Sequence, residues 1–333
     1  MTFRKPKLIR SPVLESALTV VWGSRHVSTD VKQIERHAEW LAYEELPFPE
    51  FVLPFGIGAD TDAAIDFILV STVLNFAFTD FRSSVKFQTE YAGRTWSDSE
   101  ALFACMKRAL DAGVPFLDGD YLRRVTREDL AGVFRGNIEL PMLDERVTVL
   151  REVGARLVEK YDGRFRNFVR AGSARAYDRG RGLVERLVNE FPRFRDESAY
   201  RGQTIKIYKL AQLGVWMLHA CLGKGGAFRL EDPERLTAFA DYIVPVALRV
   251  MGIQRYSKAL ERTIQKGKMV ARDSEEEIEI RAHTIYGVAL LTEEVNKRRP
   301  RNQHVINAQI DARLWTHYHA TFWPHHLTRT TMY

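Results

Sequence analysis

The chain has 333 residues, of which 45% are hydrophobic and 28% charged, an ordinary composition for a globular enzyme with a large core. Lysine and arginine number 49 against 43 acidic residues, and the net charge of +6 suits an anionic ligand but is too diffuse to indicate nucleic-acid binding. Cys105 and Cys221 are the only cysteines, which argues against a disulfide framework and a thiolate zinc site.

Neither secretion nor membrane insertion is indicated. Residues 1–13 lack the apolar core of a signal peptide. The longest apolar run, residues 63–78, is interrupted by Asp66 and Asn75, and it fits a buried helix better than a membrane span. We therefore expect a cytoplasmic protein without a membrane partner.

The first part of the chain reads as mostly helical. Two amphipathic segments occupy residues 11–42, and residues 61–78 are apolar on nearly every face, as in a central helix. Alternating residues at 83–97 predict a β-hairpin that turns at Gly93. A helix should follow, with Ser97 as its capping residue.

The pattern continues to the C-terminus. Helices are expected at 142–192 (two or three), about 204–219, 233–240, from 245 onward, 258–267, after Ser274 to about 295, and 306–315. These elements predict a mainly α fold, compact and two-lobed, with at most a small β-hairpin. We expect one domain over residues 1–333, with an N-terminal lobe of about 1–140 and a C-terminal catalytic lobe of about 141–333.

A lysine stands among apolar residues in the helix expected at 204–219. Lys206, Lys209 and Gln212 form one row along that helix, three residues apart. Two interpretations of Lys209 are open: a lysine at an interface whose ammonium reaches water, or a buried ammonium that orients an anion or a catalytic carboxylate.

Asp241 lies between Phe239 and Pro245 in another apolar stretch. Because proline disrupts a continuous helix, we expect one helix to end before Asp241 and the next to begin at Pro245. The positive end of the second helix could hold a carboxylate ionised in an apolar pocket. Asp241 is therefore either a simple helix cap or a catalytic carboxylate.

Arg281 falls on the apolar stripe of the long helix after Ser274. Glu277 precedes it by four residues, so a partly buried ion pair and a ligand-binding arginine are both open.

Two other groups of residues, the C-terminal histidines and an arginine-rich run, give weaker evidence of a functional site. No carboxylate or cysteine spacing supports a metal at His317, His319, His325 or His326, so neither a metal nor a cofactor is expected. The arginine-rich run at 164–182 lies between helices expected at 142–192 in which glutamates and aspartates are interleaved, and this favours a solvated helix face over a nucleic-acid patch.

Short motifs occur in order along nearly the whole chain: Asn75-Phe76-Ala77-Phe78, Pro141-Met142-Leu143 with Arg146, Phe194-Arg195-Asp196, Tyr208-Lys209-Leu210-Ala211-Gln212, Leu236-Thr237-Ala238-Phe239-Ala240-Asp241-Tyr242 with Pro245, Tyr256-Ser257, Glu277-Ile278-Glu279-Ile280-Arg281-Ala282, and His326-x-x-Arg329-Thr330 with Tyr333. Together they resemble the queuosine salvage family, the queuosine 5′-phosphate N-glycosylases. The family pattern usually has arginine after the lysine, where this chain has Leu210.

The resemblance implies a helical fold related to the helix-hairpin-helix DNA glycosylases. It also implies hydrolysis of the C1′–N9 bond of queuosine 5′-monophosphate, which releases queuine for salvage into tRNA. Those DNA glycosylases pair a lysine with an aspartate, and Lys209 and Asp241 match these catalytic roles. No L-P-G-x-G-type hairpin lies between the two residues, which favours a mononucleotide over duplex DNA.

The chemistry fits these residue types. Cleavage of an N-glycosidic bond builds an oxocarbenium ion, which an ionised carboxylate stabilises. A 7-deazaguanine has carbon in place of N7, so protonation there cannot assist departure of the base. We therefore assign Asp241 to the sugar cation and Lys209 to orienting that carboxylate or holding a substrate oxygen.

The 5′-phosphate needs cationic and hydrogen-bonding partners, and we expect these to be His326, Arg329 and Tyr256.

The flat base needs aromatic faces, which Phe76, Phe78 and Tyr242 could supply, although plain core packing also explains the two phenylalanines. Asp80 is the candidate carboxylate for the guanine-like edge and the amine of the side arm.

Two other functions stay open: a base glycosylase acting on DNA or RNA, and a non-catalytic helical binding module. The second would leave Lys209 and Asp241 exposed and far apart. We expect a monomer whose partner is a small nucleotide, with no stable nucleic-acid partner.

Overall fold

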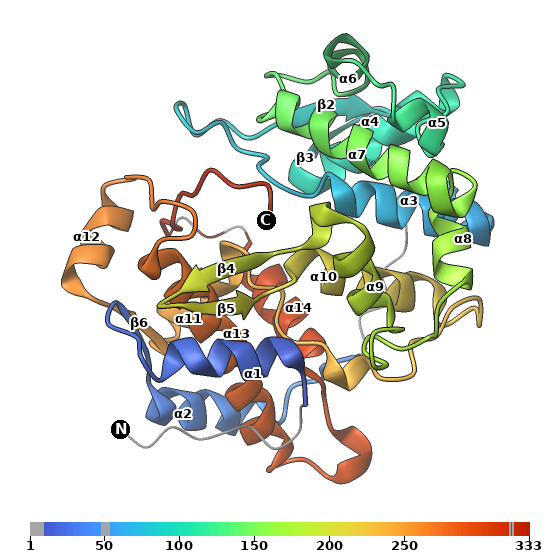
Figure 1. Ribbon diagram of the computed structural model, residues 1–333. Helices are drawn as coiled ribbons and strands as arrows, with labels where there is room; N and C mark the ends of the chain where they lie inside the picture. The colour runs from blue at the N-terminus through green and yellow to red at the C-terminus, as the bar shows by residue number, and fades with distance from the viewer. Residues whose placement is uncertain (1–9, 48–53, 320, 322) are drawn as a thin grey trace. The chain divides into compact units, whose positions relative to one another are not determined.

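A computed structural model of the protein describes residues 10–47, 54–319, 321 and 323–333, so most of the stretch 1–13 lies outside the described residues. The described chain forms fourteen α-helices and three two-stranded antiparallel sheets (Figure 1). The mainly α prediction is confirmed. Among the described helices, none is both long and apolar enough to cross a membrane.

The chain divides into two compact units built from alternating segments. Unit 1 consists of Met1–Pro49, Asp196–Gln212 and Glu231–Arg329. Unit 2 consists of Glu50–Arg195, Leu213–Leu230 and Thr330–Tyr333. The expected lobes of about 1–140 and 141–333 differ from this division, because the chain passes from one unit to the other several times.

Unit 1 is organised around α13 (Glu275–Asn296), which is buried from its third residue to its end. Among the helices that contact it are α1 (Pro12–Val21), α2 (Val31–Leu41), α11 (Ile243–Val250) and α14 (Asn307–Tyr318). Figure 1 shows α1 and α2 beside it. Such a helix has no exposed face, so any polar residue on it needs a partner inside the unit.

Unit 1 also holds two of the three strand pairs. Strand β1 (Val27–Thr29) pairs with β6 (Gln254–Tyr256), and β4 (Glu197–Tyr200) pairs with β5 (Gln203–Lys206). Neither pair was predicted from the sequence. Helix α12 (Lys258–Gln265) follows β6 and is capped by Ser257.

Two predicted helices of unit 1 are wrong in their bounds. The helix expected at 204–219 is α10, Lys209–Leu222, because its first residues belong to β5 and Tyr208 adopts a φ of 51°. The helix expected at 233–240 is only a 3-10 turn, η3 (Pro233–Arg235), followed by irregular backbone.

Unit 2 is helical around α3 (Thr61–Val73) and α7 (Leu143–Tyr161), both of which contact α8 (Phe165–Arg170). Its other elements are α4 (Asp98–Asp111), α5 (Gly119–Leu122), α6 (Arg127–Val133), α9 (Leu183–Glu190), η1 (Pro54–Ala59), η2 (Pro192–Phe194) and the rest of α10. Helix α3 confirms the predicted buried helix, since its residues from Ala64 to Val73 are all buried.

The predicted hairpin is confirmed in unit 2. Strands β2 (Gln88–Tyr91) and β3 (Arg94–Ser97) are antiparallel, and Ala92 and Gly93 make the turn with φ of 52° and 73°. The predicted cap is wrong, because Ser97 makes no side-chain hydrogen bond to the start of α4.

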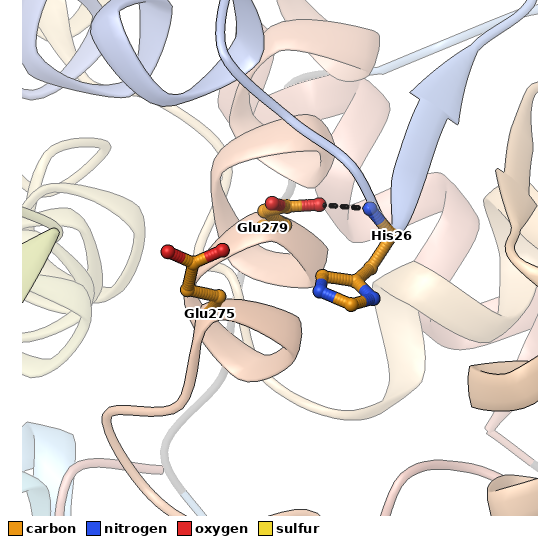
Figure 2. A group of neighbouring side chains, drawn as sticks. All are labelled: His26, Glu275 and Glu279. Carbon is orange, nitrogen blue, oxygen red and sulfur yellow. Dashed lines mark hydrogen bonds between the residues drawn. The ribbon is translucent and has the colours of Figure 1, made fainter. Parts of the chain in front are cut away.

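A buried carboxylate ties the N-terminal part of unit 1 to α13. Glu279 accepts hydrogen bonds from the backbone amides of Arg25 (3.0 Å), His26 (2.6 Å) and Val27 (3.0 Å), and from the Tyr200 hydroxyl (2.9 Å). Figure 2 shows the bond from His26. The carboxylate therefore fixes the chain just before β1.

Glu279 and its hydrogen-bond donors, which we call the Glu279 clamp, lie beside other groups that could in principle ligate a metal. One ligand atom each from His26, Glu275 and Glu279 lies within 4.8 Å of the others (Figure 2). However, the Glu279 oxygens already accept backbone amides, and Arg201 binds both oxygens of Glu275 at 2.9 and 2.7 Å. These contacts explain the cluster as an ion-paired clamp.

Glu279→Gln should lower the free energy of unfolding by about 2–3 kcal/mol, because an amide NH2 would face the backbone donors and the charge that they bind would be lost. Urea unfolding measures this loss, and hydrogen exchange should accelerate at the amides of Arg25, His26 and Val27. Glu275→Gln is the matched control: its partly exposed ion pair should contribute much less to stability, because solvent screens it. Equal losses in the two variants would contradict the clamp.

Candidate active site

The candidate site is built on a buried stretch of backbone in unit 1, Leu236–Asp241, which we call the 236–241 segment. All six residues are at most 8% exposed, and none belongs to a helix or a strand. Buried peptide groups outside regular structure must find hydrogen-bond partners elsewhere, since an unpaired group is costly away from water.

Side chains of α10, α13 and α14 supply partners. The bonds run from Asn307 Nδ2 to the Leu236 carbonyl (3.1 Å), from the Thr237 amide to Gln212 Oε1 (3.0 Å), from the Phe239 amide to Asp311 Oδ1 (2.8 Å), and from Arg281 Nε to the Ala240 carbonyl (3.0 Å). The segment is therefore held at four successive points by side chains far apart in the sequence.

Asp241 ends this segment at the start of α11. Its carboxylate accepts hydrogen bonds from the amides of Ile243 (2.7 Å) and Val244 (3.1 Å), the first two residues of the helix. The helix therefore begins before Pro245 and not at it, which corrects the predicted start. The N-terminal amides and the helix dipole both stabilise a negative charge here. Asp241 is thus a cap, and the same contacts suit a catalytic carboxylate.

Lys209 is the first residue of α10, and its backbone amide donates to Asp196 Oδ2 at 3.2 Å. The predicted row with Lys206 is wrong, because Lys206 lies in β5. Only 5% of Lys209 is exposed, which argues against an interface lysine whose ammonium reaches water. The buried-ammonium interpretation fits this burial.

A third ionisable group, Asp311 on α14, was missed from the sequence. Burial is the main cause that raises the pKa of Asp311 well above its usual value, and the nearby charge of Asp241 raises it further. The Phe239 amide and the charge of Lys209 act in the opposite direction. Asp311 therefore lies within electrostatic range of both predicted catalytic residues.

Together, Lys209, Asp241 and Asp311 give unit 1 a buried lysine, a carboxylate at a helix N-terminus, and a carboxyl group whose pKa burial raises well above its usual value. Neighbouring carboxyl groups in unlike environments are typical of sites that use one as a charge or nucleophile and the other as an acid. The arrangement can stabilise a cation and supply a proton within one site.

The expected phosphate contacts of unit 1 differ in burial. His326 is buried, and desolvation, followed by the charges of His325 and Arg281, lowers its pKa to about 3. A lowered pKa favours the neutral imidazole, which suits a hydrogen-bonding partner among the three predicted residues. Arg329 is exposed, and Tyr256 is half-buried beside the apolar cluster that includes Val27.

Tyr242, a predicted contact to the base, directly follows Asp241. Its ring lies 4.6 Å from that of His325, centroid to centroid, at an interplanar angle of 33°. An aromatic face next to the carboxylate is a suitable place for a base. His325 was considered in the sequence only as a metal ligand.

Phe76, Phe78 and Asp80 belong to unit 2, whereas the other predicted site residues belong to unit 1. Both phenylalanines are buried, and the guanidiniums of Arg146 and Arg193 lie 4.1 and 4.8 Å from the Phe76 ring. The core-packing alternative thus describes them, and contact with a base stays a prediction.

Asp80 has a local role. Its carboxylate accepts hydrogen bonds from the Ser83 amide (2.7 Å), the Ser83 hydroxyl (2.8 Å) and the Arg82 amide (3.0 Å), and these bonds lower its pKa. The carboxylate caps a turn, and its contact with substrate stays a prediction.

Comparisons with known proteins agree with the resemblance. The sequence profile of the family described as queuosine salvage protein matches residues 57–333. A protein of Sphaerobacter thermophilus, named queuosine 5′-phosphate N-glycosylase/hydrolase, is 36% identical over 328 residues, covering 97% of this chain and 98% of its own. Proteins of the same name from Mus musculus and Schizosaccharomyces pombe are 32% and 29% identical, covering 90% and 71% of this chain and 91% and 70% of their own.

The stability of an Asp311→Asn variant should respond differently to pH. Folded Asp311 keeps a proton that the unfolded chain loses above about pH 4, so wild-type stability falls as pH rises from there towards the folded pKa. Asparagine keeps an oxygen for the Phe239 amide and cannot ionise. The variant should therefore gain stability relative to wild type with rising pH, as measured by urea unfolding between about pH 4 and 8.

The exposed Asp120→Asn variant is the control and should follow the wild-type pH dependence. Parallel curves for wild type and Asp311→Asn would show that Asp311 is not protonated in the folded protein.

Proposed function

The chain belongs to the queuosine salvage protein family, and on that premise we propose that it hydrolyses the N-glycosidic bond of queuosine 5′-monophosphate and releases queuine for salvage into tRNA. Relatives that cover nearly the whole chain are named as N-glycosylases or hydrolases, which supports an enzyme acting on this type of bond.

The observation that carries the proposal is the joint burial of Lys209, Asp241 and Asp311 in unit 1. Buried ionisable groups are costly unless they are paired or used, and they gather at functional sites. A non-catalytic binding module, which would leave Lys209 and Asp241 exposed and far apart, does not account for them.

The reaction breaks the C1′–N9 bond, and the bonding electron pair leaves with the base. Water adds its oxygen to C1′. One of its protons stays on the new sugar hydroxyl, and a proton equivalent to the other reaches the base. The barrier is highest where the sugar carries positive charge and the base carries negative charge, so catalysis needs groups of both kinds.

Asp241 would stabilise the positive charge on the sugar. Its carboxylate, held by the amides of Ile243 and Val244, would stabilise the oxocarbenium ion or position the attacking water. Lys209 would orient this carboxylate or hold a substrate oxygen. Asp311 would stabilise the negative charge on the departing base, because a protonated carboxyl can donate a proton to it. This base cannot be protonated at position 7, where it has carbon in place of nitrogen.

The remaining assignments concern substrate binding. His326, Arg329 and Tyr256 would contact the 5′-phosphate. Aromatic faces would hold the base, and a carboxylate would bind its polar edge; these residues are Phe76, Phe78, Tyr242 and Asp80. The protein would act as a cytoplasmic monomer without metal or cofactor.

Purified protein incubated with queuosine 5′-monophosphate should release free queuine, which liquid chromatography detects. Queuosine without the phosphate and base-modified duplex DNA should be tested in parallel, at low and high salt. Folded protein that releases no queuine would overturn the proposal. Base release from the polymer, with salt-sensitive binding, would instead favour a nucleic-acid glycosylase.

Asp241→Asn separates catalysis from capping, because asparagine caps a helix about as well as aspartate but lacks the charge. The variant should lose ~10²–10³ in kcat, the usual effect of removing a preorganised charge, with little change in melting temperature. Asp241→Ala should show the same loss in kcat and a further loss of about 1 kcal/mol in stability. Full activity in the asparagine variant would leave Asp241 as a cap only.

A further inference from the structure

Arg281 binds the backbone next to Asp241 directly, and it is linked to the backbone at Lys209 through the carboxylate of Asp196. Its Nε donates to the carbonyl of Ala240, the residue before Asp241, at 3.0 Å. Its two Nη atoms donate to the carboxylate of Asp196 at 2.9 and 2.6 Å. The same carboxylate accepts the amide of Lys209 at 3.2 Å. One guanidinium and one carboxylate therefore connect the main chain at Asp241 with the main chain at Lys209.

The connection is buried and rigid. Arg281 is 1% exposed and Asp196 3%, and Glu277 lies 3.6 Å from the guanidinium on the preceding turn of α13. A guanidinium is planar and directs its donors at fixed angles, so three simultaneous bonds fix the positions of their acceptors. A lysine at this position would keep the charge but could not reproduce this fork.

The ion pair alone is a poor explanation for stability. Replacing a buried ion pair with apolar side chains of similar volume is often neutral or stabilising, because desolvation offsets the attraction. What an apolar pair cannot do is hold the Ala240 carbonyl and, through a carboxylate, the Lys209 amide at one spacing.

We propose that Arg281 is a positioning residue, which acts through the Ala240 carbonyl and through Asp196 to fix the spacing between Asp241 and Lys209. The inference rests on the proposed function, since the spacing matters only if these two groups act together. It assigns Arg281 no contact with substrate, in contrast to a ligand-binding arginine.

Arg281→Lys tests the proposal in the full chain, at a temperature where every variant is folded by circular dichroism. With queuosine 5′-monophosphate, kcat should fall about 10–100-fold, as expected for a misplacement near 1 Å, while KM stays within about threefold of wild type. Asp196→Asn should give a similar loss from the other side of the pair. Because both changes break one link, the double variant should lose little more than the worse single variant.

Arg186→Lys is the matched control in unit 2. Arg186 likewise donates to a carboxylate, Glu190 (3.1 Å), to the carbonyl of Phe168 (2.9 Å) and to a third group, the Tyr161 hydroxyl (2.9 Å). Its substitution should lower the melting temperature and leave kcat unchanged.

The outcomes separate the two proposals. A wild-type protein without activity overturns the proposed function. If the wild type is active and Arg281→Lys keeps the wild-type kcat, the positioning role alone is overturned. A rise in KM at unchanged kcat would also overturn it, because it would indicate direct contact with the ligand. The positioning role is also overturned if Arg186→Lys loses kcat along with melting temperature, because the loss in Arg281→Lys would then be explained by lower stability. If Arg281→Lys does not fold, Asp196→Asn carries the same test.

Discussion

Buried backbone without regular hydrogen bonding constrains unit 1 more than any other feature, because the peptide groups of the 236–241 segment must be satisfied away from water. Three helices meet this need with an asparagine, a glutamine, an aspartate and an arginine that point at the segment. Each of these polar groups occupies a core position where an apolar residue would otherwise pack. The segment and the helices around it therefore depend on one another, and Asp241 is placed where the segment ends.

The same constraint gives two neighbouring aspartates unlike surroundings. Asp241 receives two amides at the first turn of α11, where the helix dipole favours negative charge. Asp311 receives one amide in a buried setting, and its pKa is raised. Carboxyl groups that differ in this way can share the work of a reaction that needs a cation stabilised and a proton supplied. The difference between the two aspartates thus follows from the hydrogen bonding of the buried backbone as much as from side-chain chemistry.

Sequence periodicity predicted the long elements well, and it failed where tertiary contacts override it. The buried helix α3 and the turn at Gly93 were predicted, because an apolar run and a glycine at positive φ are local signals. The sequence pattern predicts a helix at residues 204–206, but these residues pair with β4. It also predicts a helix through residue 240, but the backbone of the 236–241 segment is irregular and bonds to side chains. Asp241 and Lys209 were found because they interrupt apolar stretches. Asp311 was missed, although it lies four residues after Asn307 and three before Leu314 on the buried face of α14, because a buried acid is recognisable only once its neighbours are known.

The proposed role of Arg281 illustrates how directional bonds could hold a site even where the ion pair itself adds little net stability. Its pair with Asp196 replaces strong hydration of both ions by a few fixed bonds, and in such buried pairs the cost of desolvation often cancels the gain in folding free energy. Those bonds have direction, however, and their acceptors lie next to Asp241 and Lys209. An apolar substitute would satisfy packing and leave the Ala240 carbonyl and the Lys209 amide to find other partners. The proposed role of the arginine therefore concerns the geometry of the two predicted catalytic residues more than the stability of the fold.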